Sequence, residues 1–366
     1  MKQFSAVEIL YLASELQKLI KARLSQIYQQ GRKGLILQFY MTGKGRAMLK
    51  VRVPYACYVA SEKEQSAAAG FCSLLRKKLN NSTLKALSQP GFERILQLDF
   101  SSKNSLFSLF LELFSKGNII LVHEGKILAV AEKQAWSTRE MAAGRPYKLP
   151  PAVADPRAFS DEQLLQMLKS TNKTDLVRFF ALELSLGGLY AEELCLLSGL
   201  NKKTAPATVT SASAQKILQS LKKLLNSKPF PLVIYENKAA IDAVPISLKY
   251  YENYEKKSFD SYSEALEDFF SATAAEMPSR YDSEISRLKA VIQHQEEAIA
   301  ASKNLIEKNR RSGELIYENY QEIKQLLEAV NAARKQGGWE AVKQLQKDNR
   351  RIKFVDEKTG KITMDF

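Results

Sequence analysis

The residue types on which catalysis most often depends are scarce in this chain. It contains two histidines, His123 and His294, and neither lies in a motif for nucleophilic, phosphate-binding or zinc-dependent chemistry. Cys57, Cys72 and Cys195 lie too far apart in the sequence for a zinc-binding pattern. We therefore expect a protein that is not an enzyme and that has no catalytic residues, no metal site and no cofactor.

Basic residues are concentrated at the start of the chain. Residues 1–100 contain 16 Lys and Arg against 6 Asp and Glu, a net charge of +10 out of +14 for the whole chain. Phosphate backbones attract such surfaces, and the interleaved tyrosine rings can stack on unpaired bases. We expect an RNA-binding face, with an ordinary basic surface as the alternative interpretation. The residues expected on this face lie on or beside short strands: Arg32, Lys33, Lys44 and Arg46.

An acid and a guanidinium stand together in Glu93-Arg94, directly after the turn signal Pro90-Gly91. An arginine at the start of a strand can make a bidentate contact to a phosphate. Taken alone, the pair indicates a surface ion pair at least as well as a binding site.

The elements that position these residues predict an α+β protein. A capping box, Ser5 with Glu8, begins an amphipathic helix over Ser5–Lys21. Short β-rich segments follow, with a second helix at Ala67–Leu79, and they suggest a sandwich or barrel that ends near residue 150. The expected strands are Leu35–Tyr40, Ala47–Val53, Cys57–Val59, Phe92–Phe100, Leu106–Phe114, Asn118–Val122 and Lys126–Val130.

The pattern turns helical after residue 156. Two tight glycine turns, at Gly187-Gly188 and Gly199, interrupt the helices and predict a compact helical module. The resulting domain map lists a β-rich domain, a segment that packs back on it, the helical module, a coiled-coil arm and a small middle domain that the chain leaves incomplete. The β-rich domain is expected over 1–155, with 227–260 as the segment that packs back on it, and the helical module over 156–226. The arm is expected over 261–311 and the middle domain over 312–366.

Isoleucine recurs every seventh residue between Arg280 and Arg311. This spacing is typical of a coiled-coil seam, and a seam requires a partner helix. We expect that partner beyond Phe366, with the seam left exposed in the present chain. The isoleucines of the seam are Ile285, Ile292, Ile299 and Ile306.

Four segments together resemble the NFACT family of ribosome-quality-control proteins, and its archaeal members most. They are FSAVEILYLASEL, GFERILQLDF, LFLELFSKGNIILVHEGKIL and RRSGELIYENYQEIKQLL. The resemblance covers essentially the whole chain, as the N-terminal part of a protein whose C-terminal RNA-binding domain is missing here. It implies a β-rich domain similar to DNA glycosylases, a helix–two-turn–helix module and a long helix with a middle domain.

The resemblance also implies a function. NFACT proteins bind the large ribosomal subunit obstructed by peptidyl-tRNA in the cytoplasm and recruit tRNA, commonly alanyl-tRNA, for untemplated C-terminal tailing of the stalled chain. The residues that match the family's tRNA-handling motif are Glu8, Glu93 and Arg94, and many relatives have Asp where this chain has Glu. No secretory signal or membrane span is expected.

Two other functions are weighed against this one. Residues 173–200 also resemble the helix–two-turn–helix of formamidopyrimidine-type DNA glycosylases, but those enzymes use an N-terminal proline, where this chain has Met1-Lys2-Gln3. A coiled-coil scaffold with no RNA role would explain the isoleucine seam. It would leave the charge of residues 1–100 unexplained.

Overall fold

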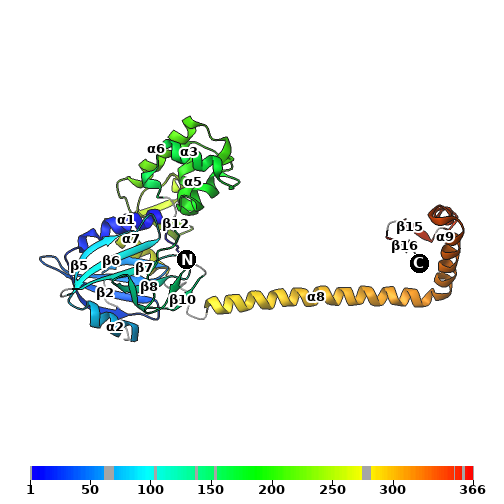
Figure 1. The fold of residues 1–366 in the computed structure, drawn as a ribbon, viewed down its shortest axis with the longest axis horizontal. Coiled ribbons are helices and arrows are strands. Elements are labelled where there is room, and N and C mark those ends of the chain that lie inside the picture. The colour runs from blue at the N-terminus through cyan, green and yellow to red at the C-terminus, as the bar shows by residue number, and fades with distance from the viewer. Residues whose placement is uncertain are drawn as a thin grey trace. The chain divides into compact units, whose positions relative to one another are not determined.

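The computed structural model describes residues 2–61, 70–102, 105–136, 139–151, 155–273, 282–349, 351–356 and 359–365, without the side chains of 282–287, 289, 290 and 294. Residues 67–69 of the expected second helix and the side chain of Ile285 lie outside this set. The chain divides into two units, Met1–Met277 and Pro278–Phe366, which are described separately (Figure 1).

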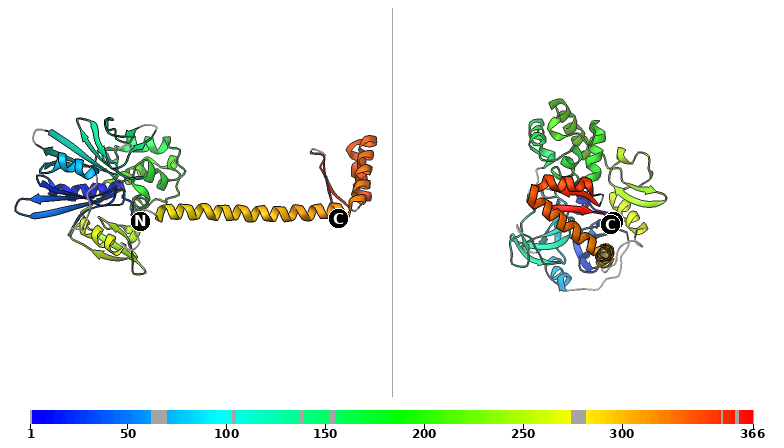
Figure 2. Two further views of the ribbon diagram at one scale, coloured as in Figure 1. Left: turned by 90° about the horizontal axis from the view of Figure 1, so that it is seen from below. Right: turned by 90° about the vertical axis from the view of Figure 1, so that its right-hand side faces the viewer.

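The first unit contains one antiparallel sheet of nine strands in the order β4-β3-β2-β1-β5-β6-β7-β8-β9 (Figures 1 and 2). Its strands are β1 (Arg23–Gln29), β2 (Gly34–Met41), β3 (Gly45–Arg52), β4 (Ala56–Ala60), β5 (Thr83–Ser88), β6 (Ile95–Ser102), β7 (Ser105–Glu112), β8 (Asn118–His123) and β9 (Lys126–Val130). Two short strands, β10 (Gln134–Ala135) and β11 (Glu140–Met141), form a separate hairpin.

The halves of this sheet fold toward each other over a common core. At the junction of β1 and β5, Arg23 is in register with Thr83, and the backbone N–H groups of Leu24 and Leu84 donate to the carbonyls of Ser82 and Ala22. Phe39 on β2 stacks on Phe100 on β6, with ring centroids 6.3 Å apart. In a flat sheet these strands would be about 14 Å apart, because neighbouring strands are spaced by about 4.8 Å. The predicted sandwich or barrel is therefore a single sheet closed over its own core.

Glycine determines two hairpin turns of this sheet. Glu124 and Gly125 both have positive φ, 48° and 74°, as a two-residue turn between β8 and β9 requires. Gly117, with φ of 65°, precedes β8 and lies against a neighbouring loop. A Cβ at Gly117 would be 2.7 Å from the backbone nitrogen of Pro54, whereas a Cβ at Gly125 would meet nothing within 4 Å.

Gly117→Ala is therefore expected to destabilise the protein more than Gly125→Ala. Both substitutions impose a left-handed conformation on alanine, at about 1–2 kcal/mol. Only Gly117→Ala also forces backbone atoms apart, which adds about 1–3 kcal/mol to the loss of stability. Urea denaturation of the two variants measures the difference. Equal losses would show that the contact with residues 53 and 54 relaxes without cost.

Helix α1 (Ala6–Leu16) lies between the sheet and the helical module (Figure 1). The predicted capping box is present, since Ser5 and Glu8 each accept a hydrogen bond from the other's backbone N–H. One face of the helix contributes Ile9 and Leu12 to the core of the sheet, and the other contributes Ala6 and Val7 to the core of the module. Helix α2 (Gly70–Leu79) covers the sheet at β1 and β6.

The helical module consists of α3 (Asp161–Ser170), α4 (Leu176–Leu182), α5 (Gly187–Ser198) and α6 (Ser211–Leu225). A small sheet of β12 (Leu232–Glu236), β13 (Ala239–Val244) and β14 (Glu255–Ser258) follows, in the order β13-β12-β14. Its residues enter both the core of the nine-stranded sheet and the core of the helical module. Helix α7 (Tyr262–Ala272) packs on β4 and β13, and the domain boundary that we placed at residue 261 does not match the structure.

The second unit begins with helix α8 (Asp282–Glu318), which continues through Gly313 and beyond the predicted end at Arg311. Helix α9 (Tyr320–Asp348) is broken at Gly337-Gly338, where the backbone dihedral angles are not helical. Its two parts and the hairpin β15 (Ile352–Asp356) and β16 (Lys361–Met364) enclose a small core around Val330 and Val342. Long as α8 is, none of the helices in the described ranges has an apolar stretch sufficient to cross a membrane.

Candidate RNA-binding site

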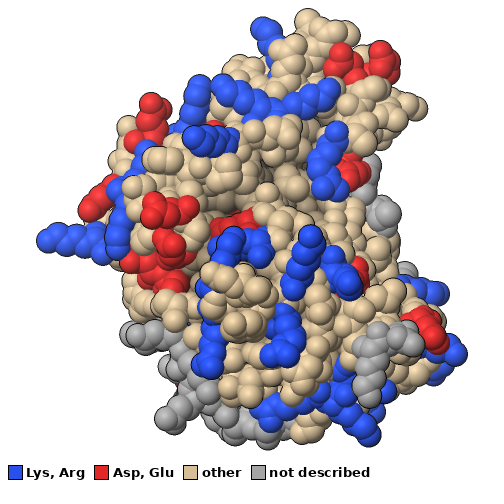
Figure 3. All heavy atoms as spheres, turned by 90° about the vertical axis from the view of Figure 1, so that its left-hand side faces the viewer, with Lys and Arg blue, Asp and Glu red and all other residues tan. Residues whose placement is uncertain are grey.

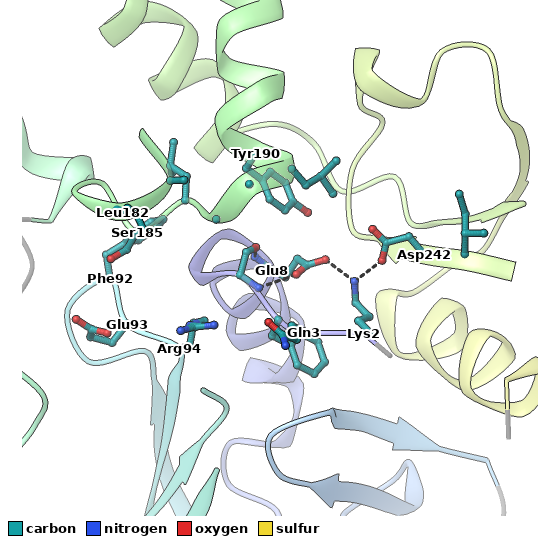
Figure 4. Close-up of a pocket in the computed structure, with 18 residues that line it drawn as sticks. Lys2, Gln3, Glu8, Phe92, Glu93, Arg94, Leu182, Ser185, Tyr190 and Asp242 are labelled. Atoms are coloured by element: carbon teal, nitrogen blue, oxygen red, sulfur yellow. Dashed lines mark hydrogen bonds and ion pairs between the residues drawn. The ribbon is translucent and has the colours of Figure 1, made fainter. Parts of the chain in front are cut away.

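A pocket of about 590 Å³ lies where α1, the loop before β6, the α4–α5 turn and β13 meet (Figure 4). All three residues assigned through the family motif line it: Glu8, Glu93 and Arg94. The fold thus brings together residues that are more than 80 positions apart in the sequence. Gly187 and Gly188 also line the pocket, at the start of α5. The third glycine of the module, Gly199, instead closes the C-terminal end of α5 with φ of 67°.

Glu8 is part of a buried charged cluster at one side of the pocket (Figure 4). The Lys2 ammonium donates hydrogen bonds to Glu8 Oε1 at 2.6 Å and to Asp242 Oδ1 at 2.7 Å. The hydroxyl groups of Tyr262 and Tyr251 donate to Glu8 and Asp242 at 3.3 and 2.9 Å. The cluster ties the N-terminus of α1 to β13.

The pKa values in this cluster follow from its burial and its charges. Burial alone lowers the pKa of Lys2, but the attraction of Asp242 and Glu8 outweighs it, so the pKa is raised. Burial raises the pKa of the Glu8 carboxyl; Lys2 lowers it, and the nearby charge of Asp242 raises it further. One cation thus balances two carboxylates, and this side of the pocket favours hydrogen-bond donors.

Gln89 fixes Glu93 and Arg94 against α1. Its buried side-chain amide donates to the carbonyl of Ala6 at 2.9 Å and to the carbonyl of Glu93 at 2.8 Å. The backbone N–H of Leu113 donates to the carbonyl of Arg94 at 2.8 Å. The loop before β6 is therefore held on both sides.

Arg94 is the cation of this pocket that is suited to an external anion. It is half-buried, and in the part of the chain that the structure describes its guanidinium donates no hydrogen bond. Burial lowers the pKa of Arg94, and the charge of Glu93 raises it, but an arginine remains protonated at neutral pH. Several N–H donors thus line a pocket without a partner among the described residues, and a phosphate oxygen can accept from them.

The Tyr190 hydroxyl is a second polar group in need of a partner. Tyr190, in the first turn of α5, is 1% exposed, and its hydroxyl has no hydrogen-bond partner among the described residues. Figure 4 shows it directed toward the side of the pocket that holds Glu8 and Asp242. A bound polar group or a water molecule would satisfy it.

The four basic strand residues do not join the pocket. Arg32 and Lys33 precede β2 and form ion pairs with Glu132, while Lys44 and Arg46 lie at the opposite end of the β2–β3 hairpin. Eight residues of strand separate the ends by about 25 Å. They therefore form no single patch. Figure 3 shows Lys and Arg side chains on both sides of a hollow in the first unit.

Sequence reasoning missed Asp242 and gave Lys2 no role beyond its place where the glycosylases have proline. Asp242 is the only charged residue in the strand Ala239–Val244, a signal that could have drawn attention to it. Lys2 forms its ion pair with a residue 240 positions away. Such a pairing leaves no local pattern in the sequence.

Comparison with known proteins gives consistent relatives. The chain is 29% identical to the archaeal Rqc2 homolog aRqcH of Methanocaldococcus jannaschii, over 98% of this chain and 57% of that protein. It is 21% identical to the ribosome quality control complex subunit NEMF homolog of Drosophila melanogaster, over 94% of this chain and 41% of that protein. The chain thus spans about half the length of these curated relatives.

Solved structures support the fold. The fibrinogen binding protein from Staphylococcus aureus matches with a TM-score of 0.60 at 18% identity, over 73% of this chain and 98% of that one. A family profile described as the NFACT N-terminal and middle domains matches residues 7–360, from the second residue of α1 to beyond the end of β15. The chain therefore belongs to the NFACT family.

Proposed function

We propose that this chain is a ribosome quality control factor that binds the large ribosomal subunit in the cytoplasm and positions tRNA, alanyl-tRNA in particular, for untemplated tailing of a stalled chain. The names of its relatives support a role in ribosome quality control. The observation that carries the tRNA contact is the single pocket lined by Glu8, Glu93 and Arg94. The guanidinium donors of Arg94, which have no acceptor among the described residues, favour an anionic partner, and RNA supplies phosphates.

We also propose that the pocket performs no covalent step. A glycosylase-like reaction needs an unprotonated amine as nucleophile. Lys2 has the buried side-chain amine of this pocket, and its two carboxylate partners raise its pKa. A protonated ammonium that donates to Glu8 and Asp242 is a poor nucleophile, which favours binding over base excision.

Arg94→Ala is expected to weaken tRNA binding by about tenfold or more, since a hydrogen bond to a charged group contributes about 1.5–3 kcal/mol. Titration of labelled alanine tRNA with the full chain, at several salt concentrations, measures the affinity. The slope of log K against log salt should decrease by about one, as one phosphate contact is lost. Recovery with large ribosomal subunits provides a second measurement.

Arg145→Ala is the matched control. Arg145 is an exposed arginine paired with Glu140 on β11, and it does not line the pocket. Its removal changes the net charge equally and should leave the affinity within about twofold, because exposed pairs contribute little. A folded Arg94→Ala protein that binds tRNA as tightly as Arg145→Ala would refute the assignment of the pocket. If the affinity measured in this titration did not depend on salt, phosphate contacts would not carry the binding, and the coiled-coil scaffold without an RNA role would be favoured.

A further inference from the structure

Arg94 is in contact with an aromatic ring that also holds a second arginine. The guanidinium carbons of Arg94 and Arg139 lie 5.9 and 5.6 Å from the centroid of the Phe114 ring. Arg139 also lies 4.9 Å from the centroid of Trp136. All three distances are within the range of cation–π attraction.

The two arginines differ in their polar partners. Arg139 is buried and donates to the buried Glu112 carboxylate at 2.8 Å and to the carbonyl of Lys148 at 3.2 Å. Its charge is therefore compensated within the fold. Arg94, on the same ring, donates to no acceptor in the described part of the chain. Of the two, Arg94 is the one able to take an outside anion.

The segment that includes Phe114 also fixes the backbone of Arg94. Glu112 pairs with Ile95 across β7 and β6, and the N–H of Leu113 donates to the carbonyl of Arg94 at 2.8 Å. Phe114 itself packs against the cluster formed by Ile95, Phe110 and neighbouring residues. Both ends of Arg94, its backbone and its guanidinium, thus contact one short segment.

A held arginine binds better than a mobile one. An arginine side chain has many rotamers, and the loss of this freedom on binding reduces affinity. A ring that restricts the guanidinium before the ligand arrives removes part of that cost. The buried Arg139–Glu112 pair in turn restricts the ring.

We propose that Phe114 is a positioning residue for Arg94. Its ring presents the guanidinium to an RNA phosphate, and the Arg139–Glu112 pair fixes the ring. This proposal rests on the proposed function for its ligand. It predicts that the ring acts through Arg94 and has no separate contact with RNA.

Phe114→Leu is expected to weaken the binding of alanine tRNA to the full chain by about three- to fivefold, the effect of one exposed cation–π contact. Phe114→Tyr keeps the ring and should bind like the wild type. In the Arg94→Ala background, Phe114→Leu should cause no further loss, because the group it positions is gone. An equal loss in both backgrounds would overturn the proposal, as would wild-type binding by Phe114→Leu.

Phe110→Leu serves as the matched control. Phe110 belongs to the same apolar cluster, and its ring stacks on Tyr147 at 4.0 Å. Its removal should affect stability without the loss of tRNA affinity seen for Phe114→Leu. Equal losses for the two variants would reduce the role of Phe114 to packing.

An NMR measurement without RNA separates this proposal from the proposed function. The Arg94 side-chain signals, assigned by their absence in Arg94→Ala, should show a ring-current shift that Phe114→Tyr retains and Phe114→Leu abolishes. If Arg94→Ala binds tRNA normally, the proposed function fails, and the ring-current shift still decides whether Phe114 holds Arg94. An unshifted signal in the wild type would overturn the positioning role.

Discussion

Replacing Lys2 with methionine is expected to destabilise the first unit by about 3–5 kcal/mol. The substitution removes the cation that balances Glu8 and Asp242, and a buried charge left without its partner has a cost of this size. Lys18→Met is the control, since Lys18 pairs with Glu15 at 3.3 Å on the surface and should contribute less than about 1 kcal/mol. Urea denaturation at pH 7 compares them.

The pH dependence of the Lys2→Met variant tests the cause of the loss. Burial raises the pKa of the Glu8 carboxyl, and without Lys2 that pKa rises further. The folded state then binds a proton more tightly than the unfolded state, whose glutamates have pKa values of about 4.3. The variant should therefore regain stability relative to the wild type as the pH falls from the raised value toward about 4.3.

A second substitution should restore part of the stability at neutral pH. Asp242→Asn in the Lys2→Met background removes one of the two carboxylate charges that Lys2 balances in the wild type. A Lys2→Met protein as stable as Lys18→Met, or one whose deficit does not change with pH, would contradict the cluster described above.

The α8 seam is expected to make the chain self-associate reversibly. Ile292, Ile299 and Ile306 are 52%, 55% and 65% exposed, although they repeat every seven residues on one helix. Each fully buried isoleucine contributes about 1.5–3 kcal/mol, so a second copy of the seam is a favourable partner. Ile292→Lys/Ile299→Lys should be monomeric in sedimentation equilibrium at concentrations where the wild type associates.

Ala300→Lys/Ala301→Lys adds the same charge outside the seam and should associate like the wild type. These alanines are exposed on α8, at positions that a coiled coil leaves in solvent. A wild-type chain that is monomeric at all concentrations would show that the exposed isoleucines are not a pairing surface.

Periodicity predicted most strands of the nine-stranded sheet but missed two of them, β1 and β5. Both contain a β-bulge, between Leu24 and Gln26 in β1 and between Leu84 and Ala86 in β5. A bulge inserts one residue and breaks the alternation of buried and exposed side chains. In β1, Leu24 and Ile27 are both buried although they are three residues apart, a spacing that places side chains on opposite faces of a regular strand. The search for a period of two therefore passed over the strands that join the halves of the sheet.

The candidate site was predictable only in part. Glu8, Glu93 and Arg94 followed from the family motif, and the structure places them in one pocket. The positions of Arg32 and Lys33 relative to Lys44 and Arg46 depend on the length of the hairpin between them. Alternation along a strand predicts the face on which a side chain lies, but it does not predict the distance between side chains along that face. The four basic residues therefore lie at opposite ends of the hairpin and do not form the single basic face that we expected.

The double burial of α1 has a consequence for synthesis of the protein on the ribosome. The helix precedes nearly all of its contacts in the chain: its sheet-facing side packs against residues that extend to Phe270, and its other side against residues as distant as Tyr251. Glu15 accepts hydrogen bonds from the backbone of Tyr262 and Ser263. Until about 270 residues have emerged, this apolar helix therefore lacks part of the residues that bury it, and such contacts of long sequence separation slow folding. A nascent chain that stops before α7 would leave this helix exposed to chaperones and proteases.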